Sequence, residues 1–194
     1  MFRPQCPRCQ RPSSHCLCSL IPSLDSSTQV LILQHPSETA HALNTARLAA
    51  LGLRKAQLRV GEVVKLPVDE RDNCLLFPGV DATPLESWAS GERPLRLIVP
   101  DGTWRKARRL LHLNPELAAL PRVSLPAGLV SRYRLRKAPV PGALSTIEAI
   151  VTVLNMLEGG GRFDQLLRPF EALIEAQIAA MGVETYQRNH GHDG

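Results

Sequence analysis

Four of the five cysteines stand close together near the N-terminus, at Cys6, Cys9, Cys16 and Cys18. Four soft thiolate ligands in so short a segment suit a tetrahedral zinc ion best. Free buried thiols are the alternative, but this proline- and serine-rich segment has no core of its own to bury them. His15 could replace one cysteine, although it and its neighbour would seldom bind the same ion. We expect a structural zinc site made of all four cysteines, because four protein ligands leave no open position for a substrate.

A second group with chemical potential is the segment Asp101-Gly102-Thr103-Trp104, which directly follows the apolar run at residues 95–100. That run predicts a buried strand, and ligands of α/β proteins gather at the carboxyl ends of the strands. Asp101 is therefore well placed for a binding or catalytic site. A simpler interpretation is that Asp101 or Thr103 caps the next helix, Gly102 serves the turn, and Trp104 packs into the core.

The rest of the chain predicts an α/β domain that would position these residues. Short apolar runs alternate with segments of helical periodicity, which is typical of parallel sheets covered by helices. We expect strands at residues 30–35, 56–60, 73–79, 95–100 and 122–128. We expect helices at residues 40–51, 104–113 and 145–157, and a final one from 163, with Pro169 near its first turn or at a kink. The domains would be a four-cysteine knuckle at residues 1–25 and this α/β unit at residues 26–194.

Charge is distributed unevenly along the chain. The formal net charge is +5, but residues 93–137 hold eleven basic and two acidic residues, which leaves the remainder at −4. A positive face attracts polyphosphate ligands, so a nucleic acid is the expected partner. A solvated charged surface without a partner is the alternative.

Membrane and secretory segments are not expected from this sequence. No apolar stretch approaches the roughly 18 residues that a membrane span needs, and the first residues lack a signal-peptide pattern. We therefore expect a cytoplasmic protein that does not bind membranes. Its oligomeric state is left open by the sequence, and a monomer is the simpler expectation.

The motifs together resemble the DTW-domain family, named for an Asp-x-Thr-Trp motif that is present here as Asp101, Thr103 and Trp104. Other segments match the family in the same order along the chain. They are the N-terminal cysteines, HPSE at 35–38, NTA at 44–46, LLFPG at 75–79, YRLRKAP at 133–139 and LSTIEA at 144–149. The resemblance thus extends over roughly residues 6–157.

The resemblance implies transfer of the 3-amino-3-carboxypropyl group of S-adenosylmethionine to N3 of a uridine in tRNA. It also implies a SPOUT-like α/β fold, with helices on both faces of the sheet and a C-terminal trefoil knot, in residues 26–194. Two other functions fit the same residues. One is a SPOUT-type RNA methyltransferase, and the other is a non-catalytic, zinc-containing RNA-binding protein.

The implied reaction needs a base, because uridine N3 is a poor nucleophile until it loses its proton. Asp101 is the candidate catalytic base, and Glu148 and Glu38 are rivals. Trp104 is the second candidate catalytic residue, since an aromatic ring could stack on a base or face the sulfonium. Core packing is the competing interpretation for Trp104.

The co-substrate would be held at the start of the helix that follows Leu144. The spacing of Ser145 and Glu148 is that of a capping box, and the amides of Ser145 to Ile147, together with the hydroxyl of Ser145 or Thr146, could bind its carboxylate. Capping alone would also explain the spacing. The resemblance adds the loops that follow strands, as the binding site for adenine. The expected set is Phe77, Pro78, Gly79, Pro100, Asp101, Gly102, Leu125, Pro126, Ser145, Thr146 and Glu148.

Basic residues near this site would contact phosphates of the tRNA and contribute affinity that falls with salt. The expected RNA-binding set is Arg105, Lys106, Arg108, Arg109, Arg132, Arg134, Arg136 and Lys137. Because phosphate contacts carry little sequence information, we expect the shape of the folded RNA to supply the rest of the recognition.

Overall fold

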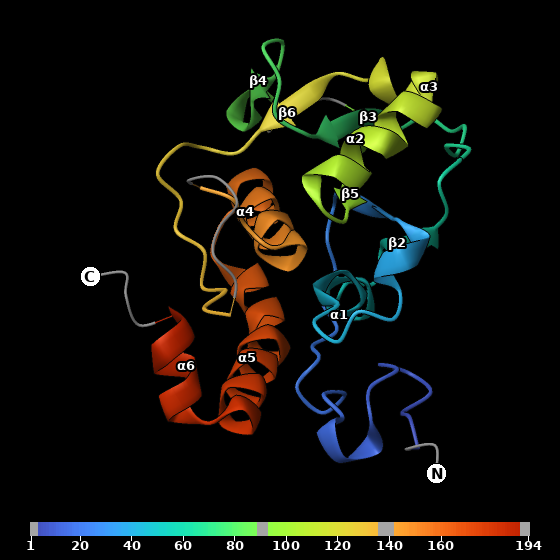
Figure 1. The fold of residues 1–194 in the computed structure, drawn as a ribbon. Helices are drawn as coiled ribbons and strands as arrows, with labels where there is room; N and C mark the ends of the chain where they lie inside the picture. The colour runs from blue at the N-terminus through green and yellow to red at the C-terminus, as the bar shows by residue number, and fades with distance from the viewer. Residues whose placement is uncertain (1–3, 89–92, 136–141, 191–194) are drawn as a thin grey trace.

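A computed structural model describes residues 4–88, 93–135 and 142–190 of the chain. Its centre is a six-stranded, entirely parallel sheet with the strand order β2-β1-β5-β3-β6-β4 (Figure 1). The strands are β1 (Gln29–Gln34), β2 (Ala56–Val60), β3 (Asp72–Leu76), β4 (Thr83–Pro84), β5 (Leu95–Asp101) and β6 (Arg122–Ser124). The α/β class expected from the sequence is confirmed.

The interior residues of β1 and β5 are apolar because both faces of these strands are covered. In β1, Val30 and Ile32 belong to one core cluster, whereas Leu31 and Leu33 belong to another. Successive side chains of a strand point to opposite faces, so this division marks the two sides of the sheet. A parallel sheet buried on both sides needs this kind of continuous apolar run.

Helices cover both faces, as expected (Figure 1). One core cluster contains side chains of α1, α4 and α5, and the other contains Leu111 and Leu117 of α2 and α3. The helices are α1 (Thr45–Gly52), α2 (Trp104–Leu113), α3 (Pro115–Ala118), α4 (Thr146–Glu158), α5 (Leu167–Met181) and α6 (Val183–His190). Short 3₁₀ turns occupy Ser13–His15, Pro36–Glu38, Leu85–Trp88 and Arg162–Leu166. Pro169 lies in the first turn of α5, where its missing amide hydrogen is harmless.

The first helix is shorter than its periodicity predicted. It begins at Thr45 instead of residue 40, because the Asn44 side chain accepts a hydrogen bond from the Arg47 amide at 3.1 Å and caps the helix there. The segment before it folds into the turn Pro36–Glu38. The strands expected at 73–79 and 122–128 end earlier, at Leu76 and Ser124. Pro78 and Pro126 have no amide hydrogen to continue the ladder.

The N-terminal segment packs onto the α/β unit. Cys9, Leu17 and Ile21 are buried in the same cluster as α1 and α5. A further bridge joins Leu24 to Leu53 at the end of α1. The apolar side chains of the N-terminal segment are therefore buried in the hydrophobic core of the α/β unit. Among the described residues, no helix is both long and apolar enough to cross a bilayer.

Candidate active site

Asp101 ends β5 at the carboxyl edge of the sheet, directly opposite Gln34 at the end of β1. Only 8% of Asp101 is exposed. One carboxylate oxygen accepts a hydrogen bond from the Gln34 side-chain amide at 2.8 Å, and the other accepts one from the Thr146 hydroxyl at 2.5 Å. The structure therefore joins residues from two strands and from the first turn of α4.

Burial raises the pKa of the Asp101 carboxyl above its ordinary value. The hydrogen bonds from Gln34 and Thr146 favour the charged form and oppose this shift, while the nearby charge of Glu38 adds to it. A carboxylate with a raised pKa is a stronger base than an exposed one. Asp101 thus has the environment that a catalytic base needs.

The network continues to residues that the sequence did not single out as site residues. Gln34 donates to the Asn44 side-chain oxygen at 3.2 Å, and the same oxygen caps α1. Gln34 is completely buried. The glutamine that ends the apolar run of β1 was the available signal, because a buried amide needs polar partners.

Three helices begin around Asp101. Asn44 precedes α1, Thr103 accepts a hydrogen bond from the Lys106 amide and caps α2, and Thr146 opens α4. Helix N-termini carry partial positive charge and unpaired amides, so their convergence favours an anionic ligand. Gly102 has a φ of 140°, a conformation that other residues rarely adopt, and this allows the sharp turn between Asp101 and α2.

The two rival bases are already engaged. The Glu148 carboxylate is buried and accepts hydrogen bonds from the amide and hydroxyl of Ser145, the hydroxyl of Ser131 and the amide of Arg132. The capping box expected from the sequence is confirmed, and its Glu148 also binds the loop at Ser131 and Arg132. Glu38 pairs with Lys106 at 2.5 Å. Among the described residues, Asp101 accepts two hydrogen bonds, both from side chains, whereas Glu148 accepts four in all.

Trp104 stands at the start of α2 and meets Phe77, which follows β3. Their ring centroids are 5.6 Å apart in an edge-to-face arrangement, and both side chains are half-buried. The Arg122 guanidinium lies 5.9 Å from the Phe77 ring centroid. Trp104 is therefore not a fully buried core residue, and it shares an edge of the sheet with Asp101.

Other residues of the expected co-substrate set lie at the same edge. Pro78 and Gly79 follow β3, Leu125 and Pro126 follow β6, and these two strands are neighbours in the parallel sheet. A side chain at Gly79 would come within 2.8 Å of the Arg122 guanidinium. Glycine therefore lets the loop after β3 approach that arginine closely.

The four N-terminal cysteines form a compact cluster, as expected. Their sulfur atoms all lie within 4.8 Å of one another, with 3.6 Å between those of Cys6 and Cys18 and 3.8 Å between those of Cys9 and Cys16. A tetrahedron with Zn–S bonds of about 2.3 Å has edges of roughly 3.8 Å. The backbone amide of Cys9, assisted by that of Arg8, lowers the pKa of Cys6 to about 6. The cluster fits a tetrahedral thiolate-bound metal ion.

Comparison with known proteins agrees with these features. A family model for the DTW domain matches residues 3–178. The chain belongs to the DTW-domain family. It is 33% identical to tRNA-uridine aminocarboxypropyltransferase 2 of Drosophila melanogaster, over 94% of this chain and 78% of that protein. A protein of the same name from Mus musculus is 34% identical, over 91% of this chain and 64% of that protein. The tRNA-uridine aminocarboxypropyltransferase A of Arabidopsis thaliana is 28% identical, over 80% of this chain and 73% of that protein. No solved structure matches.

The motif of this DTW-domain protein divides into three local roles. Asp101 lies in the buried network, Thr103 caps α2, and Trp104 pairs with Phe77. The helix-capping interpretation is correct for Thr103. It is incomplete for Asp101, whose side chain hydrogen-bonds Thr146, 45 residues further along the chain.

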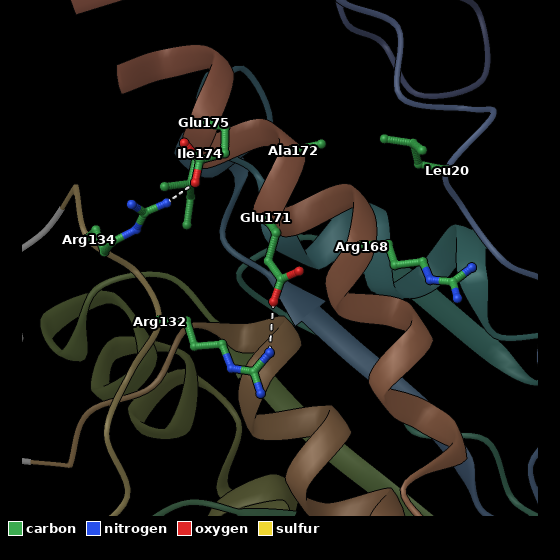
Figure 2. A pocket seen from close by; sticks show the side chains of 8 residues that line it. All are labelled: Leu20, Arg132, Arg134, Arg168, Glu171, Ala172, Ile174 and Glu175. Carbon is green, nitrogen blue, oxygen red and sulfur yellow. Dashed lines mark hydrogen bonds and ion pairs between the residues drawn. The ribbon is translucent and has the colours of Figure 1, made fainter. Parts of the chain in front are cut away.

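The expected RNA-binding residues of this DTW-domain protein fall into two groups. On α2, Arg105 and Arg108 are exposed, while Lys106 pairs with Glu38 and Arg109 pairs with Glu62 at 2.9 Å. Arg132 and Arg134 instead lie against α5, where they line a hollow of about 720 Å³ away from Asp101 (Figure 2). A smaller hollow of about 180 Å³ lies between them and α4 and includes Glu148. Arg136 and Lys137 lie outside the described residues.

Proposed function

We propose that this DTW-domain protein transfers the 3-amino-3-carboxypropyl group of S-adenosylmethionine to N3 of a uridine in tRNA. The observation that carries the proposal is the similarity to proteins named tRNA-uridine aminocarboxypropyltransferase, which extends over 80–94% of the chain. The environment of Asp101 supports it, because the reaction needs a carboxylate of raised proton affinity next to a site for an anionic group.

In the proposed reaction the N3 proton of uridine passes to the Asp101 carboxylate. The N3 electron pair then forms a bond to the terminal methylene of the aminocarboxypropyl group. The bond from that carbon to the sulfonium breaks, its electrons return to sulfur, and methylthioadenosine leaves. The sulfonium has three carbons that could react, so the orientation of the co-substrate decides the product.

The same edge of the sheet would hold the co-substrate. The first turn of α4, a helix of thirteen residues, presents the amides of Thr146 and Ile147, and the positive end of such a helix suits the carboxylate of the aminocarboxypropyl group. Ser145 binds Glu148 and would hold this turn in place. The rings of Trp104 and Phe77 would lie near the sulfonium. Loop residues would surround the adenosine, and these are Pro78, Gly79, Pro100, Gly102, Leu125 and Pro126. Glu148 would act by holding the start of α4 in place.

We also propose the finer features of the fold. They are a SPOUT-like domain at residues 26–194 and a C-terminal trefoil knot; the parallel sheet with helices on both faces supports the α/β part of this proposal. Residues 1–25 would form a metal knuckle. Its four thiolates would hold zinc in a structural role, because they leave no coordination position for substrate.

Basic side chains would bind the phosphates of the tRNA around the Asp101 site. On α2 these are Arg105, Lys106, Arg108 and Arg109, and Arg132 and Arg134 would act in the same way beside α5. Arg136 and Lys137 complete the proposed set from outside the described residues. The ion pair of Arg109 with Glu62 is exposed, so exchanging that carboxylate for a phosphate would cost little, whereas the pair of Lys106 with Glu38 is mostly buried and would have to open first.

The test is an incubation of the protein with S-adenosylmethionine and unmodified tRNA, followed by identification of the nucleoside by-product. We expect methylthioadenosine with the wild type, and at least a hundredfold less with Asp101→Asn. Asp72→Asn is the matched control, because Asp72 is an exposed carboxylate at the opposite end of the strands, where it pairs with Arg93. Release of S-adenosylhomocysteine would overturn the proposal in favour of methyl transfer.

A further inference from the structure

The hollow against α5 is built from three separate parts of the chain. Leu20 comes from the N-terminal segment, Arg132 and Arg134 come from the loop before α4, and Arg168 lies on α5. Figure 2 shows Arg132 and Arg134 reaching toward the helix from one side, with Arg168 on the other side of Glu171. Three arginines thus line one hollow of about 720 Å³.

Two glutamates of α5 neutralise part of this charge. Glu171 pairs with Arg132 at 2.7 Å, and Glu175 pairs with Arg134. No ion pair involves Arg168 within residues 4–88, 93–135 and 142–190, so its charge faces the hollow without compensation. The hollow carries a surplus of one positive charge.

These ion pairs are exchangeable. The exposed fractions of the side chains are 60% and 49% for Arg132 and Glu171, and 50% and 63% for Arg134 and Glu175. Ion pairs exposed to this extent contribute about 0–1 kcal/mol, because water screens them. A phosphate offers more oxygen acceptors and a fork-matched geometry, so it can replace a carboxylate on arginine at little cost.

The backbone of the loop that carries Arg132 and Arg134 is nevertheless anchored. The Arg132 amide donates to the buried Glu148 carboxylate at 2.6 Å, and the Tyr133 ring packs 5.7 Å from the Phe170 ring of α5. Glu148 lies two residues after Thr146, which binds Asp101. The N-terminal end of α4 therefore connects the hollow rigidly to the Asp101 site, and a ligand in one has a defined position relative to the other.

The face of α5 also has a repeat suited to an extended anion. Arg168, Glu171 and Glu175 are spaced by three and four residues, which places them on one side of the helix. They span about 10.5 Å along its axis. Arg132 and Arg134 pair with Glu171 and Glu175, so together with Arg168 the three arginines are distributed over two helical turns and not at a single point.

We propose that this hollow binds the ribose-phosphate backbone of the tRNA, with Arg168 as a contact not expected from the sequence. Arg132 and Arg134 bind beside it, while Glu171 and Glu175 compete with the phosphates for the same guanidinium groups. The competition weakens binding to any polyanion that lacks the shape to reach all three arginines. The choice of tRNA as the ligand rests on the proposed function.

The experiment measures tRNA affinity at 50 and 200 mM salt, without S-adenosylmethionine. One phosphate contact contributes about threefold to the loss of affinity between these salt concentrations. Arg168→Ala should therefore reduce this loss by about threefold and weaken binding at 50 mM. Arg93→Ala is the matched control, since Arg93 is an exposed arginine at the opposite edge of the sheet, and it should bind tRNA as the wild type does. Thermal unfolding checks that both variants fold.

A second variant tests the competing glutamates. The double change Glu171→Gln and Glu175→Gln should raise tRNA affinity severalfold and steepen its salt dependence. Wild-type affinity and salt dependence in both the arginine and the glutamine variants would overturn the proposal, and so would weaker binding by the glutamine variant. The by-product assay is independent of this outcome, so failure of the proposed transfer reaction and failure of the hollow as an RNA site are distinguishable.

Discussion

Replacing Glu148 with glutamine separates its structural role from a role in catalysis. The buried carboxylate accepts four hydrogen bonds: three on one oxygen, from Ser131 and Ser145, and one on the other, from the Arg132 amide at 2.6 Å. Glutamine has one acceptor oxygen. If that oxygen keeps the three donors, the new NH2 group must face the Arg132 amide, and a buried donor loses its partner.

An unpaired buried donor costs about 1–3 kcal/mol, and the loss of charge assistance on the remaining bonds adds roughly 1 kcal/mol. We therefore expect Glu148→Gln to lower the free energy of unfolding by about 2–4 kcal/mol, measured by urea denaturation. The transfer rate of the folded protein should remain within about threefold of wild type. Full stability combined with a hundredfold loss of transfer would show that Glu148 is the base and refute its structural assignment.

Three further predictions follow from other buried groups. At neutral pH Asp101→Asn should be more stable than the wild type, because burial raises the pKa of Asp101 and penalises its charged form. In urea denaturation across pH this gain should shrink as pH falls through the folded-state pKa, where the wild type binds a proton; a constant difference would contradict it. Chelation, or Cys6→Ser, should expose Leu17 and Ile21 and cost about 3–6 kcal/mol; unchanged thermal unfolding would remove the structural role of the metal. Arg96→Met should cost about 3–5 kcal/mol in urea, because Arg96 is 1% exposed and pairs with Asp69; a change below 1 kcal/mol would contradict it.

The central strands could be predicted because burial on both faces leaves a simple pattern. The interior residues of β1 (30–33) and of β5 (97–99) are apolar without alternation, which is typical of a parallel sheet between two layers of helices. The start of α1 could not be predicted from periodicity. Asn44 competes with the helix by binding its first amides, and the same side chain meets Gln34 across the edge of the sheet.

The place of Asp101 in the candidate site could be predicted from its position directly after a strand. Asp101 follows a strand, and the carboxyl ends of parallel strands meet at one edge. Its partner Thr146 lies in a segment that the sequence explains equally well by a capping box, so only the fold shows that the capping box also brings the Thr146 hydroxyl to Asp101. The ion pair between Arg132 and Glu171 joins residues 39 positions apart, and no periodicity connects a loop to a helix at that distance.

The most direct test of the proposed transfer uses S-adenosylmethionine labelled either in its carboxyl carbon or in its methyl carbon. After incubation with tRNA, the RNA is digested and the labelled nucleoside is identified. We predict that the carboxyl label enters a uridine substituted at N3, and that the methyl label leaves with methylthioadenosine. Recovery of the methyl label in the RNA, with none of the carboxyl label, would contradict aminocarboxypropyl transfer by this DTW-domain protein.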